Sequence, residues 1–165
     1  MDRSQVSQWR SEVITSFIGV EQLLNCIISQ HYFKAINKSF FLEVLYDAYF
    51  DFGLRRRILE KFLPQDQNAM LQPLNRMAAI RNYFAHCGLE VIENVGLPIL
   101  EELGPVLDPQ NTERPLDFER LFNEFKELEK AVVEPLVEVF KDWGGSCHRA
   151  ADGRLIITTN VQQGS

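Results

Sequence analysis

The chain has 165 residues, of which 45% are hydrophobic and 24% charged, an ordinary composition for one globular domain with a buried core. No apolar run approaches the roughly 20 residues that a bilayer-spanning helix needs, and the first residues lack the basic-then-apolar layout of a signal peptide. The three cysteines are far apart and form no C-x-x-C pair, which favours reduced thiols in a cytoplasmic protein.

The net charge of −6 is unevenly spread along the chain. Residues 1–90 carry 10 Lys and Arg against 9 Asp and Glu, whereas residues 91–165 carry 7 against 14. An acidic chain argues against nucleic-acid binding driven by bulk charge. A local basic site in the neutral first half is still compatible with this composition.

The first predicted helix runs from about Ser4 to Tyr32, because apolar residues recur there at spacings of three and four. Gly19 in its middle indicates either a point where another helix crosses closely or a slight bend. Glu21 and Asn25 flank the apolar stripe. They are either a solvated helix edge or groups that orient polar residues of a neighbouring helix.

A second helix is predicted after Ser39, a suitable N-cap, and before Gly53. Its apolar stripe would consist of Phe41, Leu45, Ala48 and Phe52. Three carboxylates step by four along its polar side. These carboxylates are Glu43, Asp47 and Asp51. Like charges at this spacing repel, and no His or Cys lies among them, so we interpret them as a solvated acidic face rather than a metal site. Asp51 is expected to pair locally with Arg55.

A third helix is predicted from about Leu54 to Leu63, with Pro64 ending it. Its Arg55-Arg56-Arg57 run points in three directions around the helix axis. Either it is a solvated basic turn, or part of it contacts phosphate.

The next helix is predicted from Asn68 or Pro73 to Cys87, closed by Gly88. At about 100° per residue, one side of it is apolar and faces the core, whereas Asn82 and His86 lie on nearly the opposite side, with Arg81 at the border. Small residues surround these polar groups and would let another helix come close. The core side comprises Leu74, Met77, Ile80, Phe84 and Cys87, and the small residues are Ala78, Ala79 and Ala85.

The second half of the chain predicts a turn with a short helix near 97–103, and a proline-containing loop at 104–115. A long amphipathic helix follows from about Asp117 to Trp143, with Pro135 expected to kink it. The tail after Gly144 reads as a small hairpin, Cys147–Ala151 with Arg154–Thr159, too short to stand without leaning on the bundle or a partner. The fold prediction is therefore all-α: an up-and-down bundle of four to five main helices at 1–143, with a small C-terminal β-hairpin tail at 144–165.

The chemistry of Arg81, Asn82 and His86 suits RNA cleavage without a metal or any other cofactor. A neutral imidazole can take a proton from a ribose 2′-hydroxyl, and a guanidinium can hold the attacked phosphate and stabilise its extra negative charge. Asn82 could fix the imidazole or contact the phosphate. DNA, which lacks the 2′-hydroxyl, should be inert. A dimer would supply a second His86 to protonate the leaving oxygen.

The segment Ile80–Gly88, with Arg81-Asn82-x-x-x-His86 near a helix end, resembles the R-x(4–6)-H motif of the HEPN superfamily. The resemblance implies a dimeric helical bundle acting as a metal-independent endoribonuclease of toxin or defence type. RNA and a second copy are the implied partners, with a cognate antitoxin or a nucleotidyltransferase-like protein as further candidates. The residues expected to contact RNA are Arg55, Arg56, Arg76 and Tyr83, and those expected to orient the site are Glu21 and Asn25.

Two other functions, and a purely structural role for the motif, stay open beside the nuclease. Many members of the superfamily are non-catalytic interaction or regulatory modules, and a transcriptional regulator is less favoured because no helix-turn-helix signature is present. In the purely structural alternative, His86 caps the end of its helix and Arg81 extends from the core to solvent. Cys147 and His148 lack further metal ligands nearby, so no metal site is predicted.

Overall fold

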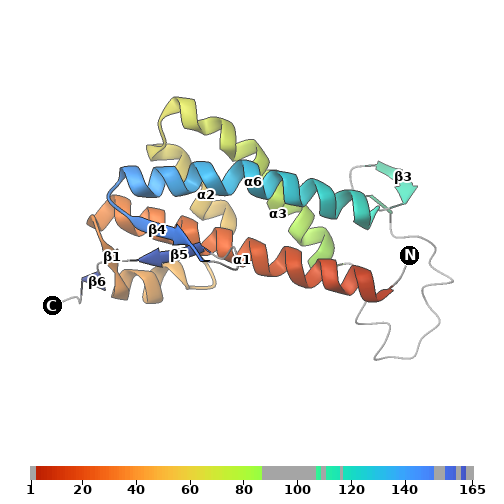
Figure 1. The fold of residues 1–165 in the computed structure, drawn as a ribbon, viewed down its shortest axis with the longest axis horizontal. Coiled ribbons are helices and arrows are strands. Elements are labelled where there is room, and N and C mark those ends of the chain that lie inside the picture. The colour runs from red at the N-terminus through yellow and green to blue at the C-terminus, as the bar shows by residue number, and fades with distance from the viewer. Residues whose placement is uncertain are drawn as a thin grey trace.

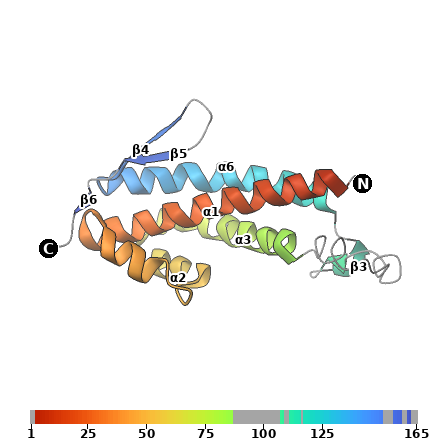
Figure 2. The same cartoon turned by 90° about the horizontal axis from the view of Figure 1, so that it is seen from below.

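The computed structural model describes residues 3–86, 107–108, 111–115, 117–150, 155–158 and 161–162. The predicted all-α bundle with a small hairpin tail is confirmed (Figure 1). Helices α1 and α6 lie side by side and run in the same direction, whereas α3 runs antiparallel to both (Figures 1 and 2). The main helices are α1 (Arg3–Phe33), α2 (Phe52–Phe62), α3 (Leu71–His86) and α6 (Phe118–Asp142).

The hydrophobic core lies where α1, α3 and α6 meet. The apolar side predicted for α3 is buried, since Leu74, Met77, Ile80 and Phe84 have no exposed surface. Phe84 contacts the ring of Phe118 at the start of α6. The stripes of the two long helices fill the rest of the core with Val13, Phe17, Val20, Leu24, Ile27, Leu121, Phe125, Val132, Leu136, Val139 and Phe140.

Helix α1 matches its predicted bounds within one residue at each end. A Cβ built at Gly19 would meet nothing within 4 Å, so among the described residues no other element crosses closely there. By length and composition, Ser4–Phe33 could also cross a membrane, but half of its most apolar stretch is buried inside the protein. The core helices of soluble proteins can have the same length and composition, and α1 packs against α3 and α6.

The prediction of a regular second helix between Ser39 and Gly53 is wrong. The chain forms a short π-helix, η1 (Phe40–Leu45), followed by turns up to Phe50. The Asp47 carboxylate accepts a hydrogen bond from the backbone N–H of Tyr49 at 2.8 Å, and such a local bond competes with helical pairing. Ala48, expected on the apolar stripe, is exposed.

Helix α2 begins at Phe52 because Asp51 caps it, accepting a hydrogen bond from the backbone N–H of Leu54 at 2.7 Å. Gly53 therefore lies in its first turn rather than between two helices. A 3₁₀ helix, η2 (Gln65–Met70), leads into α3. Pro73 is the third residue of α3, in the first turn, where a missing backbone N–H is least harmful.

Helix α6 starts where it was predicted, with Asp117 accepting a hydrogen bond from the backbone N–H of Arg120 at 2.9 Å. It runs through Pro135 to Asp142 as one helix. It ends in a Schellman motif, in which Gly144 adopts φ 87° and Gly145 donates to the carbonyl of Phe140 at 2.9 Å.

The predicted C-terminal hairpin is present, with β4 (Ser146–Arg149) antiparallel to β5 (Leu155–Thr158). Cys147 and Ile157 pack against the core, so the hairpin leans on the bundle. A parallel pair of β1 (Ile36–Asn37) and β6 (Val161–Gln162) was not predicted. A second antiparallel pair, β2 (Leu107–Asp108) with β3 (Asn111–Pro115), forms where the sequence predicted a loop. The Cys87-Gly88 helix end and the short helix near 97–103 lie outside the described residues.

Candidate functional site on helix α3

Asn82 and His86 lie one turn apart on the outer side of α3, and both are exposed. Within the described residues neither side chain makes a hydrogen bond or an ion pair. His86 is the last residue of α3. The small residues expected beside them, Ala78, Ala79 and Ala85, are partly exposed. This side of the helix therefore presents an amide and an imidazole on a surface lined by small side chains.

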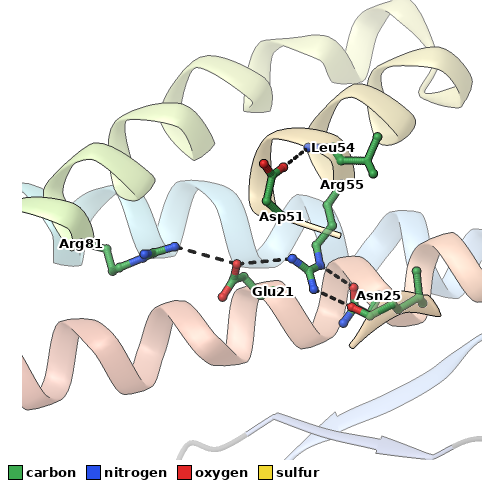
Figure 3. Close-up of polar contacts among 7 residues, drawn as sticks. Glu21, Asn25, Asp51, Leu54, Arg55 and Arg81 are labelled. Carbon is green, nitrogen blue, oxygen red and sulfur yellow. Dashed lines mark hydrogen bonds and ion pairs between the residues drawn. The ribbon is translucent and has the colours of Figure 1, made fainter. Parts of the chain in front are cut away.

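Arg81 lies at the boundary between α3 and α1, with 29% of its side chain exposed. Its guanidinium carbon sits 4.8 Å from the centre of the Phe17 ring. Its Nη2 lies 3.9 Å from Oε1 of Glu21 (Figure 3). The ion pair is long and partly solvated, so it contributes little energy by itself. Together, the ring and the carboxylate hold the guanidinium near α1.

The Glu21 carboxylate also faces a second guanidinium, with Nη1 of Arg55 at 3.7 Å (Figure 3). Arg55 is buried: its Nε donates to Oδ1 of Asn25 at 2.7 Å, and its Nη2 donates to the carbonyl of Leu45 at 2.6 Å. Burial lowers the pKa of Arg55, and attraction to Glu21 opposes that shift. Arg55 thus ties α2 to α1 and η1 and is directed away from solvent.

Of the two residues expected to orient the site, Glu21 lies beside Arg81, whereas Asn25 binds Arg55. The residues expected to contact RNA do not gather around His86. Arg76 forms a bidentate ion pair with Glu124 of α6, in which its Nε donates to Oε1 at 2.6 Å and its Nη2 donates to Oε2 at 2.8 Å. Hydrogen bonding to Glu124 raises the pKa of Arg76, with a smaller contribution from Tyr83. Arg56 pairs with Glu60 of its own helix.

Two residues near the site were not singled out from the sequence. Phe17 is a buried residue of the apolar stripe of α1, and its ring lies against the Arg81 guanidinium. Arg10 of α1 donates from Nη2 to the carbonyl of Ala85 at 3.4 Å, so a cation from α1 reaches the end of α3. Both roles depend on the antiparallel packing of α1 and α3, which the sequence pattern does not display.

No group of three or more His, Cys, Asp and Glu side chains that could hold a metal occurs within the part of the chain that the structure describes. Burial raises the pKa of Cys26 to about 12 and also raises that of Cys147. Both thiols are therefore protonated near neutral pH, which makes them poor nucleophiles and poor metal ligands.

Among the described residues, the arrangement offers a guanidinium held at the edge of α3, with an imidazole and an amide that have no partner there on the outer side of the helix. These groups can bind and polarise a phosphate and exchange one proton, but a second proton-transfer group has to come from elsewhere. No family model, curated protein or solved structure matches the chain.

Proposed function

We propose that this protein is a metal-independent endoribonuclease of toxin or defence type that acts as a cytoplasmic homodimer. His86 serves as the acid and base, and Arg81 stabilises the phosphorane. The proposal agrees with the HEPN-like motif at Arg81, Asn82 and His86.

The observation that carries the proposal is the exposure of Asn82 and His86 on the same helix as Arg81, whose guanidinium is held by Phe17 and Glu21. Asn82 and His86 have no partner among the described residues and lie on a helix side lined by alanines, so they can meet a ligand or a second subunit without breaking a bond seen there. Arg81 keeps part of its surface open between α1 and α3, while Phe17 and Glu21 restrict its movement. Restricting a catalytic side chain in advance lowers the entropy lost in the transition state.

Two-fold pairing through this side of α3 would supply the missing proton-transfer group. In one subunit the other two histidines are far along the chain: His31 packs on Phe62 and Trp143, and His148 lies on β4. The second imidazole in the proposed site is therefore His86 of the other subunit.

In the proposed reaction, one His86 takes the proton of a ribose 2′-hydroxyl as that oxygen attacks the adjacent phosphorus. The bond from phosphorus to the 5′-oxygen breaks, and the second His86, protonated, donates a proton to the leaving oxygen. The products are a 2′,3′-cyclic phosphate end and a 5′-hydroxyl end. Arg81 neutralises the charge that builds on the phosphate oxygens.

The test is cleavage of a mixed RNA pool in EDTA by the wild type, His86→Ala and Arg81→Ala. We expect cleavage to leave 2′,3′-cyclic phosphate ends and to fall by about 10²- to 10⁴-fold in His86→Ala and by about 10²- to 10³-fold in Arg81→Ala. Lys130→Ala is the matched control, because this exposed lysine lies on α6 and pairs with Glu127 of its own helix.

Each variant is first shown to be folded and to keep the oligomeric state of the wild type. Equal activity in His86→Ala and wild type would rule out the assigned site. Absence of cleavage by a well-folded wild-type dimer would reject the nuclease itself.

The second candidate function is a non-catalytic HEPN-like dimeric interaction or regulatory module. It is favoured by the engagement of Arg55 and Arg76, two of the cations expected to contact a phosphate backbone, in hydrogen bonds within the subunit. A stable dimer that cleaves no RNA, and whose state is unchanged by RNA, would support this function.

A further inference from the structure

A cavity with a volume of about 270 Å³ lies at the end of the bundle where α1 and α6 both terminate and the β4–β5 hairpin begins. Figure 1 shows these two helix ends at the same end of the molecule, and Gln30 of α1 bonds Trp143 directly after α6. The volume is below the roughly 300 Å³ at which sites for drug-sized molecules begin, so the cavity suits a small ligand. It is lined by residues of α1, α6, β4 and β5 and of the turns after the two helices, among them Gln30, Lys34, Phe140, Gly145, Ser146 and Thr158.

The walls of the cavity are fixed by hydrogen bonds and close packing. The hydroxyl of Ser29 donates to the carbonyl of Ala35 at 3.1 Å and accepts from the backbone N–H of Asn37 at 3.0 Å, which holds the chain after α1. A Cβ at Gly145 would collide with the ring of Phe140, so the ring and the backbone are in direct contact there. Binding to such a preformed cavity would cost little conformational entropy.

Gln30 brings a buried amide to the cavity wall. It is only 6% exposed, and its Nε2 donates to the carbonyl of Trp143 at 2.8 Å. Because a carbonyl can only accept, this bond fixes the orientation of the amide and leaves Oε1 as an acceptor for another group. Oε1 accepts no hydrogen bond from a residue that the structure describes. A buried amide oxygen in this state favours a ligand that donates a hydrogen bond to it.

Lys34 brings a positive charge to the same cavity. It is exposed, it forms no ion pair within the described ranges, and it carries the only charge among the described lining residues. Its backbone has φ 56°, a left-handed conformation that usually selects glycine directly after a helix. A side chain at such a strained position points to a role for the side chain itself. The charge of the cavity therefore suits an anionic group.

The C-terminal ends of α1 and α6 do not cancel this preference, although helix ends of this kind carry partial negative charge. Their last carbonyls are already bonded: that of Phe140 accepts from the backbone N–H of Gly145 at 2.9 Å, and that of Gln30 accepts from the backbone N–H of Lys34 at 2.9 Å. Carbonyls that are satisfied in this way expose little negative charge. The ammonium of Lys34 is then the dominant charge at the cavity.

We propose that this cavity binds a small carboxylate that carries a hydrogen-bond donor on the adjacent carbon, that is, an α-hydroxy acid or an α-amino acid. The carboxylate pairs with Lys34, and the neighbouring hydroxyl or ammonium donates to Oε1 of Gln30. The carbon skeleton lies against the ring of Phe140. Each part of the ligand thus meets one group of the cavity that has no other partner of that kind among the described residues.

This inference does not rest on the nuclease proposal. Arg10, which reaches the end of α3 beside His86, and Gln30 lie 20 residues apart on the same helix. At 1.5 Å per residue the two places are separated by about 30 Å along α1. The variants His86→Ala and Arg81→Ala are therefore expected to bind the carboxylate as the wild type does.

Titration of the full ¹⁵N-labelled chain with L-lactate, L-serine and acetate, followed by NMR, tests the ligand class. We expect lactate or serine to shift the side-chain amide signal of Gln30 and the backbone signals of Gly144 and Gly145 in a saturable way. Acetate lacks the donor and should bind about tenfold more weakly. The tighter of lactate and serine shows whether the donor is a hydroxyl or an ammonium. No saturable shift of these signals with either probe, or equal binding of acetate, would overturn the proposal.

Substitution of Lys34 tests the charge. Lys34→Met keeps the length of the side chain and should weaken binding of the better probe at least about tenfold. Lys130→Met is the matched control, because this exposed lysine of α6 pairs with Glu127 away from the cavity. Equal affinities of the two variants would exclude Lys34 from the site.

Lys34→Gly separates a role in binding from a role in the fold. Glycine adopts positive φ without strain, so this variant should raise the melting temperature of the free protein while losing binding to the same extent as Lys34→Met. Retained binding in Lys34→Gly would overturn the assignment. Weaker binding accompanied by a lower melting temperature would show that Lys34 supports the fold instead, and would equally count against it.

Discussion

A single carboxylate, Glu21, lies between the guanidiniums of Arg55 and Arg81, and the two arginines differ in what else holds them (Figure 3). Arg55 is buried and has two further strong hydrogen bonds, to Asn25 and Leu45. Arg81 is partly exposed and rests on an aromatic ring. Two cations that share one anion thus differ in their surroundings: Arg55 is engaged within the fold, and Arg81 keeps part of its surface open.

Removing Asn25, the hydrogen-bond acceptor of the buried Arg55, should destabilise the protein. Asn25→Ala leaves Nε of the largely buried Arg55 without its hydrogen-bond acceptor, and we expect a loss of about 1–3 kcal/mol in the free energy of unfolding. Urea denaturation measures it. Arg56→Ala is the control, since its partly exposed pair with Glu60 is worth less than about 1 kcal/mol. Equal losses in both variants would contradict the structural role of Asn25.

His31 should make the free energy of unfolding depend on pH. Its ring stacks on Phe62 with centroids 4.1 Å apart and lies 5.0 Å from Trp143, and burial, with a smaller contribution from Lys34, lowers its pKa below 6.5. The unfolded chain then takes up the proton at a higher pH than the folded one. The neutral His31 side chain therefore makes its full contribution to the free energy of unfolding above pH 6.5. This contribution is lost as the pH falls through the lower pKa that His31 has in the folded protein.

The variant His31→Phe keeps an aromatic ring and cannot be protonated. We expect the melting temperature of the wild type to fall more steeply than that of His31→Phe between pH 6.5 and pH 5. Thermal unfolding followed by circular dichroism measures the difference. Parallel curves for the two proteins would show that His31 does not contribute to the pH dependence.

At the scale of elements, the two glycines at Gly19 and Gly145 should respond oppositely to alanine. Gly19 is inside α1 with open space around it, so Gly19→Ala should stabilise the protein by about 0.5–1 kcal/mol through higher helix propensity. A Cβ at Gly145 would collide with the ring of Phe140 after α6 ends, so Gly145→Ala should destabilise. Chemical denaturation of both variants gives the two signs, and a destabilising Gly19→Ala would indicate a close contact at that position.

Element starts and ends were predictable where one side chain controls the backbone. Asp117 caps α6 as its position before the apolar stripe indicates, and Gly144-Gly145 ends that helix. The second predicted helix failed because periodicity at Phe41, Leu45 and Phe52 does not reveal that Asp47 and Asp51 bind nearby backbone N–H groups instead. Hydrogen bonds between residues close in the sequence determined the backbone conformation of this segment.

For the whole molecule, α3 is the element that joins the two long helices, because its buried side faces both α1 and α6. Phe84→Ala removes a completely buried ring at this junction and should cost about 3–5 kcal/mol. We expect far-ultraviolet and near-ultraviolet circular dichroism to report one coincident transition at lower denaturant. Separate transitions would show that α3 can detach while α1 and α6 stay paired.

The sequence by itself determined the helical class, the long outer helices, the buried side of α3 and the outward direction of Asn82 and His86. These follow from periodicity and caps, which depend only on residues a few positions apart. Only the tertiary structure decided that Arg55 is buried on Asn25, that Arg76 pairs with Glu124, and that Phe17 and Glu21 hold Arg81. Each of these contacts joins residues at least 30 positions apart, and the geometry of helix packing, which local patterns do not encode, brings them together.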